Sequence, residues 1–318
     1  METVVIVGAG VSGLSCGIRL LEAGYRAEIW ARDLPERTTS SVAAAVWYPY
    51  KAYPEDLVVS WSGATYRELM ALRADPATGI LVRTGYEIFP WAVDEPWWRA
   101  AVPGYRRISA AELPAGYVDG YVFDAPVIEM PIYLGYLQRR FEQLGGRISV
   151  RTLANLNEAL AGHATVVNCS GLGARELAAD SSVFPIRGQV VRVAQPGIER
   201  FVLDDYGPAG VAYIVPRSSD CILGGTADDG ATELAPDMST AEGIFGRCLA
   251  LDERLRGATV LEHKVGLRPG RPTVRLERET PADGQAVVHN YGHGGAGITL
   301  SWGCADEVAR LVAEARPA

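Results

Sequence analysis

The sequence predicts an α/β fold in which a Rossmann-like, nucleotide-binding domain, discontinuous in sequence, is joined to a second domain built on a mixed β-sheet. Three observations predict this fold. A short apolar run, a glycine-rich turn and a helical pattern follow one another at the N-terminus. An aromatic-rich segment, 51–139, then interrupts the pattern, and a second glycine-rich helix start lies at 292–300.

The N-terminal unit predicts a dinucleotide site. Residues 4–7 are a β-branched apolar run, typical of a buried parallel strand, and apolar residues at helical spacing follow until Gly24. The G-x-G-x-x-G turn between them allows a tight bend, close approach of a pyrophosphate and tight packing of helix on sheet. A glycine-rich turn of another α/β fold is the other interpretation. The residues of the turn are Gly8, Ala9, Gly10, Val11, Ser12 and Gly13.

The residues at the end of the second predicted strand, 27–30, do not decide which nucleotide is bound. An acidic residue usually binds the ribose at this point, but the chain reads Ala31, Arg32, Asp33. Either Asp33 binds the ribose while Arg32 contacts phosphate or adenine, or Arg32 selects a 2′-phosphate and the cofactor is NADP.

The middle of the chain alternates between the two predicted domains. A helix at 133–144, a strand at 147–150 and a buried strand at 165–169 continue the nucleotide fold, whereas 189–225 is sheet-like. We therefore expect a nucleotide-binding domain and a substrate-binding domain that share the chain. The first takes residues 1–50, 140–185 and 268–318, and the second takes 51–139 and 186–267.

Composition and charge exclude several classes of protein. A net charge of −8 without any lysine or arginine run argues against nucleic-acid binding. There is no apolar run long enough for a membrane span and no leader-like N-terminus, so we expect a cytoplasmic protein without a membrane partner. We expect no metal, because His289 and His293 flank glycines in a turn. The oligomeric state stays open, with a homodimer as one option.

Several separated motifs together resemble the D-amino acid oxidase family, within the FAD-dependent amine oxidoreductases. They occur in family order over nearly the whole chain. They comprise the 8–13 turn, Arg32-Asp33, 37–47, 166–171, 212–216, 266–269 with the following 274–279, and 289–295.

This resemblance implies FAD, held non-covalently, as the cofactor. The backbone from 294 to 299 would meet the pyrimidine edge of the flavin, where a helix N-terminus stabilises negative charge. Leu153 would lie near the adenine half and Ser170 near the cofactor at its strand end. The further residues implied at the cofactor are Thr38, Thr39, Ser40, Ala44, Ala45, Val46, Gly294, Gly295, Gly297, Ile298 and Thr299.

The resemblance also implies the substrate site. Arg268 would pair with the substrate carboxylate through its planar fork, and the Tyr213 hydroxyl would support it, with Gly295 nearby. Core packing is the alternative interpretation for Tyr213, and Tyr48 and Tyr50 are open between pocket and core. These residues would hold a D-amino acid so that its α-hydrogen leaves as hydride, and this positioning would supply the catalysis. O2 would then reoxidise the flavin, and the products would be 2-oxo acid, ammonia and hydrogen peroxide.

The substrate side chain is expected to be neutral, apolar or aromatic. Aspartate-preferring relatives carry an added arginine just after Gly-Gly-Thr, whereas Ala227 stands there in this chain. Arg217 could reach the pocket and bind an acidic side chain, so it is the one arginine that speaks against this preference. The alternatives are a glycine or sarcosine oxidase, a D-aspartate oxidase, a dehydrogenase passing electrons to a partner, an NAD(P)-dependent dehydrogenase if the first glycine turn is taken alone, and an inactive nucleotide-binding module.

Overall fold

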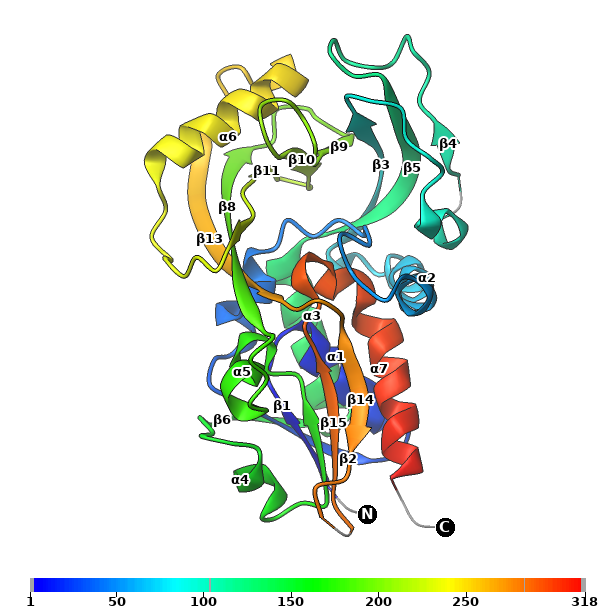
Figure 1. Cartoon of the computed structure of the whole chain (residues 1–318), viewed down its shortest axis with the longest axis vertical. Helices are drawn as coiled ribbons and strands as arrows, with labels where there is room; N and C mark the ends of the chain where they lie inside the picture. Colours follow the sequence, from blue (N-terminus) through cyan, green and yellow to red (C-terminus); the bar gives the residue numbers. More distant parts are fainter. Residues whose placement is uncertain (1–2, 103, 283, 316–318) are drawn as a thin grey trace.

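Two β-sheets lie one above the other along the long axis of the molecule. The computed structural model describes residues 3–102, 104–282 and 284–315. A six-stranded sheet occupies the lower half of Figure 1 and a nine-stranded sheet the upper half. The two-sheet α/β architecture expected from the sequence is confirmed.

The six-stranded sheet carries the nucleotide-binding pattern. All neighbouring pairs are parallel except at one edge, where β14 runs antiparallel to β15. The central strands are almost wholly apolar because helices or loops cover both faces, as is usual for parallel strands. In spatial order the strands are β14 (Arg275–Glu279), β15 (Ala286–Tyr291), β7 (Thr165–Asn168), β1 (Thr3–Val7), β2 (Arg26–Ala31) and β6 (Arg147–Val150).

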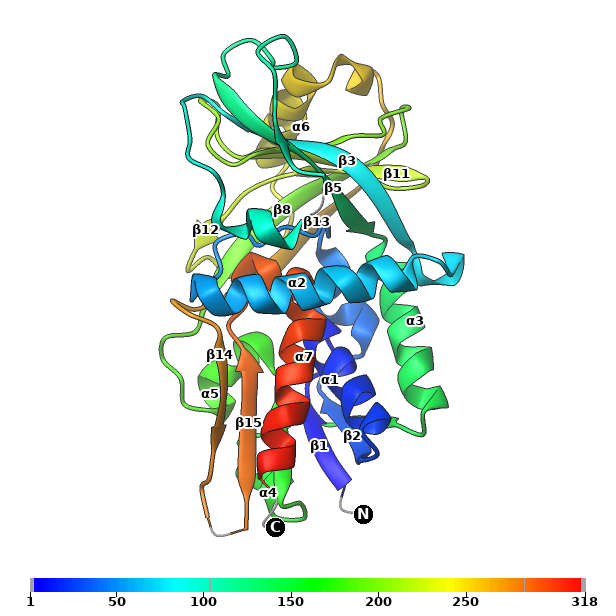
Figure 2. The same ribbon diagram turned by 90° about the vertical axis from the view of Figure 1, so that its right-hand side faces the viewer.

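Long helices pack beside this sheet. Helix α1 (Val11–Glu22) contacts both α3 (Met130–Gln143) and the C-terminal α7 (Gly297–Glu314). Helix α2 (Glu55–Leu72) crosses α7 at the level between the two sheets (Figure 2). Helix α3 begins three residues before the predicted 133–144 because Pro131, in its first turn, needs no N–H partner there.

The nine-stranded sheet is mixed, mostly antiparallel, with a parallel pair between β3 and β9. Strand β13 pairs with β8 and reaches down toward the six-stranded sheet (Figure 1). Helix α6 (Met238–Leu251), capped by Asp237, packs against β8, β10 and β11. The strands are β12 (Asp228–Asp229), β8 (Phe184–Ala194), β11 (Asp220–Gly224), β10 (Ala212–Pro216), β9 (Phe201–Asp204), β3 (Ile80–Phe89), β5 (Asp119–Ile128), β4 (Arg106–Arg107) and β13 (Val260–Gly270).

Short helical segments connect these elements. No helix within the described ranges is long and apolar enough to cross a bilayer. The segments are η1 (Pro35–Arg37), η2 (Thr39–Val42), η3 (Pro76–Thr78), η4 (Trp97–Ala101), α4 (Asn157–Leu160), η5 (Gly171–Gly173), α5 (Ala174–Leu177), η6 (Glu253–Leu255) and η7 (Gly294–Ala296).

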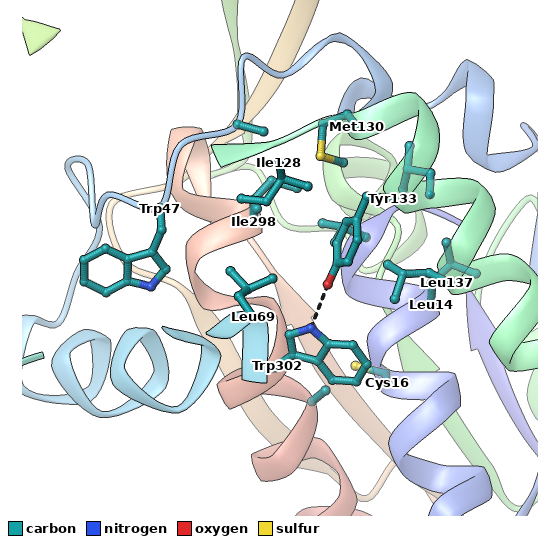
Figure 3. Packing of buried hydrophobic residues seen from close by; sticks show 14 of the residues in the cluster. Leu14, Cys16, Trp47, Leu69, Ile128, Met130, Tyr133, Leu137, Ile298 and Trp302 are labelled. Carbon is teal, nitrogen blue, oxygen red and sulfur yellow. Dashed lines mark hydrogen bonds between the residues drawn. The ribbon is translucent and has the colours of Figure 1, made fainter. Parts of the chain in front are cut away.

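The main core joins the helices to the loop that leads to the second sheet. Trp302 of α7 is fully buried, and its indole N–H donates a hydrogen bond of 2.8 Å to the Tyr133 hydroxyl of α3 (Figure 3). Trp47 is also fully buried, and its indole donates to the Ser62 carbonyl of α2 at 3.0 Å. Since both indole N–H groups are satisfied, these large side chains are buried without an unpaired donor.

The packing bears on the predicted domain boundaries. Helices α2 and α3 come from the segment 51–139 and its end, which the sequence assigned mainly to the substrate-binding domain. Both pack against helices of the six-stranded sheet. We therefore propose that α2 and α3 belong to the nucleotide-binding domain, and we keep the remaining predicted boundaries as a proposal.

Candidate active site

One cavity is lined by residues of both sheets. Its volume is about 970 Å³, at the upper end of the usual range for ligand pockets. It begins at the carboxyl ends of β1 and β2, where parallel α/β sheets bind their ligands, and continues to β10 and β13 of the nine-stranded sheet. This cavity therefore brings together the two halves of the site that the sequence predicted.

The N-terminal glycine turn has the geometry that the motif requires. Gly8 has φ of +112°, and a Cβ there would lie 2.4 Å from the Cys169 carbonyl oxygen. A Cβ on Gly13 would lie 1.9 Å from the Gly8 carbonyl oxygen, so Gly13 lets α1 pack onto the turn. Gly13 does not line the cavity, whereas Gly8 to Ser12 do. Its contribution is to position the turn from behind.

The 38–46 segment forms the wall that faces this turn. The Ser40 hydroxyl accepts a hydrogen bond of 3.1 Å from the Val11 backbone N–H, which ties η2 to the start of α1. Thr39 donates to the Leu267 carbonyl at 3.0 Å and thereby links the segment to β13. The implied cofactor residues Thr38, Thr39, Ser40, Ala44, Ala45 and Val46 all line the cavity.

Two helix N-termini open onto the cavity. Helix α1 starts at Val11 and α7 at Gly297, and neither has an acidic residue in its first turn. Their positive ends are therefore not compensated by the protein and favour negative groups of a ligand. Gly294, Gly295, Gly297 and Ile298 line the cavity at the start of α7.

Thr299 does not line the cavity but supports its wall. Its hydroxyl donates to the Tyr48 carbonyl oxygen at 2.9 Å and accepts from the Tyr48 N–H at 3.1 Å. The side chain is buried, so it fixes the backbone of Tyr48 to α7 instead of meeting a ligand.

Replacing Thr299 by valine should lower the free energy of unfolding. Valine keeps the shape but leaves the Tyr48 N–H and carbonyl without their partner, which costs about 1–3 kcal/mol. Chemical denaturation of the purified variant measures the loss. Ser301→Ala is the matched control because the Ser301 hydroxyl bonds only to Ile298 of its own helix, and it should cost less. Equal stability of the Thr299→Val variant and the parent would contradict this role.

We use the name adenosine end for the part of the cavity beyond β2, where the sequence predicts the adenosine of the cofactor. It contains Arg32 and Asp33, whose roles the sequence left open. Arg32, Asp33 and Leu153 line the cavity, and the Arg32 guanidinium donates to the Asp33 carboxylate at 2.8 Å. The Arg32 side chain is 76% exposed and already paired with an acid. Which of the two contacts the ribose stays a prediction. Ser170 also lines the cavity, and its hydroxyl donates to Asn168 at 2.6 Å.

Arg268 and Tyr213 meet at the opposite end. The Arg268 guanidinium lies over Gly188, where a Cβ would be 2.4 Å from Nη1, and it donates to the Thr226 carbonyl oxygen at 3.1 Å. The Tyr213 ring lies over Gly224, its partner across β10 and β11, where a Cβ would be 1.9 Å from Cζ. Two glycines therefore make room for the two side chains.

Burial keeps the Tyr213 phenol neutral. It raises the pKa of Tyr213, and the nearby Arg268 only partly opposes the rise. The hydroxyl is therefore available as a hydrogen-bond donor throughout the physiological range, next to a permanent positive charge.

Tyr48 and Tyr50 both line the cavity but differ in their contacts. The Tyr48 hydroxyl donates to the buried carboxyl of Glu87, and burial raises the pKa of Glu87 to about 8. Tyr50 lies against Gly295, where a Cβ would be 2.8 Å from its Cδ1. Tyr50 therefore lines the cavity beside the start of α7 with Lys51 as its polar neighbour, whereas the Tyr48 hydroxyl is bound to a buried carboxyl.

Arg217, which the sequence left open, is held away from the cavity. It forms a two-point ion pair with Asp220, at 2.6 Å and 3.0 Å, and both side chains are buried. Ala227 does line the cavity. Arg217 is therefore unavailable to a substrate carboxylate.

The sequence placed His289 and His293 together in a turn, but His289 lies in strand β15 and only His293 lies in the loop that follows. Both are bound to protein groups. His293 contacts the Asn290 side-chain oxygen at 2.9 Å, and burial lowers its pKa to about 4. His289 contacts Glu279 at 3.1 Å and Asn168 at 3.3 Å.

Sequence reasoning missed several residues of the substrate end, above all Asp205. Asp204 ends β9 and Asp205 directly follows it, so an acid at the end of a strand was the available signal. We use the name substrate end for the part of the cavity around Arg268 and Tyr213. Its lining residues are Tyr48, Tyr50, Gly188, Val190, Leu203, Asp205, Val211, Tyr213, Val215, Thr226, Ala227, Leu234 and Arg268.

The fold and the glycine turn that lines the cavity define a dinucleotide-binding protein. The chain belongs to the FAD dependent oxidoreductase family, whose family model matches residues 3–311. The predicted membership and FAD as the cofactor are thereby confirmed, and the NAD(P)-dependent alternative is set aside.

Similar proteins agree with this assignment over nearly the full length. A D-amino-acid oxidase of Rubrobacter xylanophilus is 58% identical over 98% of this chain and 96% of its own. A human D-aspartate oxidase is 40% identical over 98% of this chain and 94% of its own. The crystal structure of glycine oxidase from Geobacillus kaustophilus shares the fold, with a TM-score of 0.83 at 19% identity, covering 100% and 96% of the two chains.

Proposed function

We propose that the protein is an FAD-dependent D-amino acid oxidase that yields 2-oxo acid, ammonia and hydrogen peroxide. The observation that carries this proposal is the Arg268–Tyr213 pair, which lies at one end of the cavity whose other end is the glycine turn. The similarity to D-amino-acid oxidases supports it.

The residues of the substrate end would act by binding and orienting. Arg268 offers a planar fork to the substrate carboxylate, and the neutral Tyr213 hydroxyl donates a further hydrogen bond. Bound FAD would supply the acceptor for the α-hydrogen, taken as hydride, and the route of the electrons to oxygen. The apolar walls formed by Leu203, Val211 and Val215 exclude water from the substrate. Fixing the substrate in a reactive orientation supplies a large part of the rate.

The charges of the substrate end argue against an acidic side chain. Arg268 is the only cationic residue that lines this end among the described residues, and the α-carboxylate takes it. Arg217 is bound to Asp220, and Asp205 would repel a second carboxylate. We therefore propose that D-aspartate is a poor substrate, despite the similarity to a D-aspartate oxidase, and that neutral apolar or aromatic side chains are accepted.

Anaerobic mixing with D-alanine and with L-alanine tests the proposed activity. Bleaching of the oxidised-flavin band by D-alanine alone, with peroxide released on admitting air, is the expected result. If glycine or sarcosine bleaches the flavin and D-alanine does not, the glycine oxidase alternative replaces this proposal. Bleaching by D-alanine without peroxide in air would instead indicate a dehydrogenase.

The Tyr213→Phe variant should bind benzoate more weakly. It loses one hydrogen bond to a carboxylate, worth about 1.5 kcal/mol, so Kd should rise about tenfold. The phenyl ring can keep its place over Gly224, and flavin binding should persist. Titration of the flavin spectrum with benzoate measures the effect. Tyr206→Phe is the control, because Tyr206 is exposed and does not line the cavity; equal Kd values for the two variants would exclude the role of Tyr213.

We propose O2 as the electron acceptor and the cytoplasm as the location. A measurement of native mass distinguishes a monomer from a homodimer.

A further inference from the structure

An unpaired carboxylate lies in the substrate end. Asp205 directly follows β9, is half-buried, and lines the same cavity as Arg268. Its carboxylate has no hydrogen bond or ion pair with any other residue that the structure describes. By contrast, Asp33, at the adenosine end, is paired with Arg32. A carboxylate removed from bulk water without a partner is unfavourable, so the site is prepared for a cationic group.

The carboxylate of Asp205 is ionised, and no neighbouring cation among the described residues is paired with it directly. Burial raises the pKa of Asp205 to about 6, while Lys51 and Arg268 oppose the rise and Asp204 adds to it. The Lys51 ammonium lies over the rings of Tyr50 and Tyr206, at 5.1 Å and 5.8 Å, and Lys51 does not line the cavity. Asp205 therefore carries its charge above pH 7, and Lys51 acts on it only from outside.

The position of Arg268 decides which cation of a substrate Asp205 would meet. With the α-carboxylate on Arg268, the remaining cations are the α-ammonium and the side chain. A carboxylate beside the α-ammonium would hold its proton, which opposes loss of hydride from a neutral amine. A side-chain ammonium carries no such penalty, because its proton takes no part in the reaction.

We propose that Asp205 binds the side-chain ammonium of basic D-amino acids, so that the D-lysine and D-ornithine class is accepted together with neutral substrates. This inference rests on the proposed oxidase function. It makes Asp205 a determinant of specificity and gives the substrate end an order of preference: basic and neutral side chains are accepted, and acidic ones are rejected.

A pair of non-reacting ligands tests the recognition by itself. 6-Aminohexanoate is lysine without its α-amine, and hexanoate is similar in length and lacks the terminal ammonium. Their Kd values are measured at pH 8 by perturbation of the flavin spectrum in the parent, in Asp205→Asn and in the control Asp229→Asn. Asp229 is exposed on β12 and does not line the cavity, so its substitution makes the same change of net charge outside the site.

The expected result is a selective loss in Asp205→Asn. The affinity for 6-aminohexanoate, relative to hexanoate, should fall at least about tenfold, while Asp229→Asn keeps the parental ratio. A ratio that stays within about twofold of the parent in Asp205→Asn overturns the proposal. Should that variant bind no flavin, the same comparison is made with Asp205→Ser.

Turnover separates this inference from the proposed function. The ratio of kcat/KM for D-lysine over D-norleucine should fall at least about tenfold in Asp205→Asn. An equal fall for both substrates would place Asp205 at the α-ammonium and refute side-chain recognition. If the parent oxidises D-alanine but the ratio does not respond to the substitution, only this inference fails. If the parent oxidises no D-amino acid, the proposed function fails first.

Discussion

Replacing Arg268 by alanine should reduce kcat/KM for D-alanine by about 10²- to 4 × 10³-fold while FAD stays bound. The substitution removes the one cation that lines the substrate end among the described residues, and losing one partner of a buried charge pair costs about 3–5 kcal/mol. The KM should rise strongly, because binding of the carboxylate is lost before reaction begins. Steady-state kinetics, together with the flavin absorbance of the variant, measures both quantities.

Two further variants show whether the loss comes from the charge of Arg268, from its planar fork or from general damage to the protein. Arg268→Lys keeps the charge but not the fork, so its kcat/KM should lie between those of the parent and the alanine variant. Arg256→Ala removes an exposed arginine paired only with Glu253 and should leave kinetics unchanged. Near-normal turnover by Arg268→Ala would refute the assignment of Arg268, and loss of flavin would show that the residue supports the cofactor side of the cavity instead.

The nucleotide half of the fold was predictable because local sequence determines it. Residues 4–7, the 8–13 turn and the following helix occur as expected, since a β-branched run and fixed glycine positions allow few other conformations. The 133–144 helix was found with a shifted start. The substrate-binding sheet was harder to order, because β3 pairs in parallel with β9 across more than a hundred residues of chain. Pairing at such separation leaves no local signal.

The site shows the same division. Motif residues such as Gly10, Ser40 and Arg268 line the cavity as the resemblance implied, because each belongs to a recognisable local pattern. Gly13 belongs to the first motif and Thr299 follows the last one, but both lie behind the wall. Which residues face the cavity depends on how the folded backbone is turned there, and residue identity does not reveal this. Asp205 has no motif. It became visible only when the fold brought the end of β9 and strand β13 to the same cavity as Arg268.

Replacing Gly10 by valine should weaken FAD binding by about two orders of magnitude without unfolding the protein. Gly10 has φ of −72° and ψ of −178°, an extended conformation that valine readily adopts. A Cβ would lie 3.2 Å from the Ser40 hydroxyl, on the cavity side of the turn, so the added methyl groups would occupy the space that the pyrophosphate needs. Overpacking of this kind costs about 3 kcal/mol, which is about 150-fold in Kd.

The graded series and its control distinguish this steric cause from general damage. Gly10→Ala adds one carbon and should give an intermediate Kd, measured by titrating apoprotein with FAD and following flavin fluorescence. A Cβ on Gly246, in α6, would have no atom of another segment within 4 Å, so Gly246→Val should bind FAD as the parent does. Circular dichroism should show folded protein in all three variants. A Gly10→Val protein that is purified yellow, with parental affinity, would mean that the pyrophosphate does not approach this turn, and the placement of the cofactor along the cavity would have to be reversed.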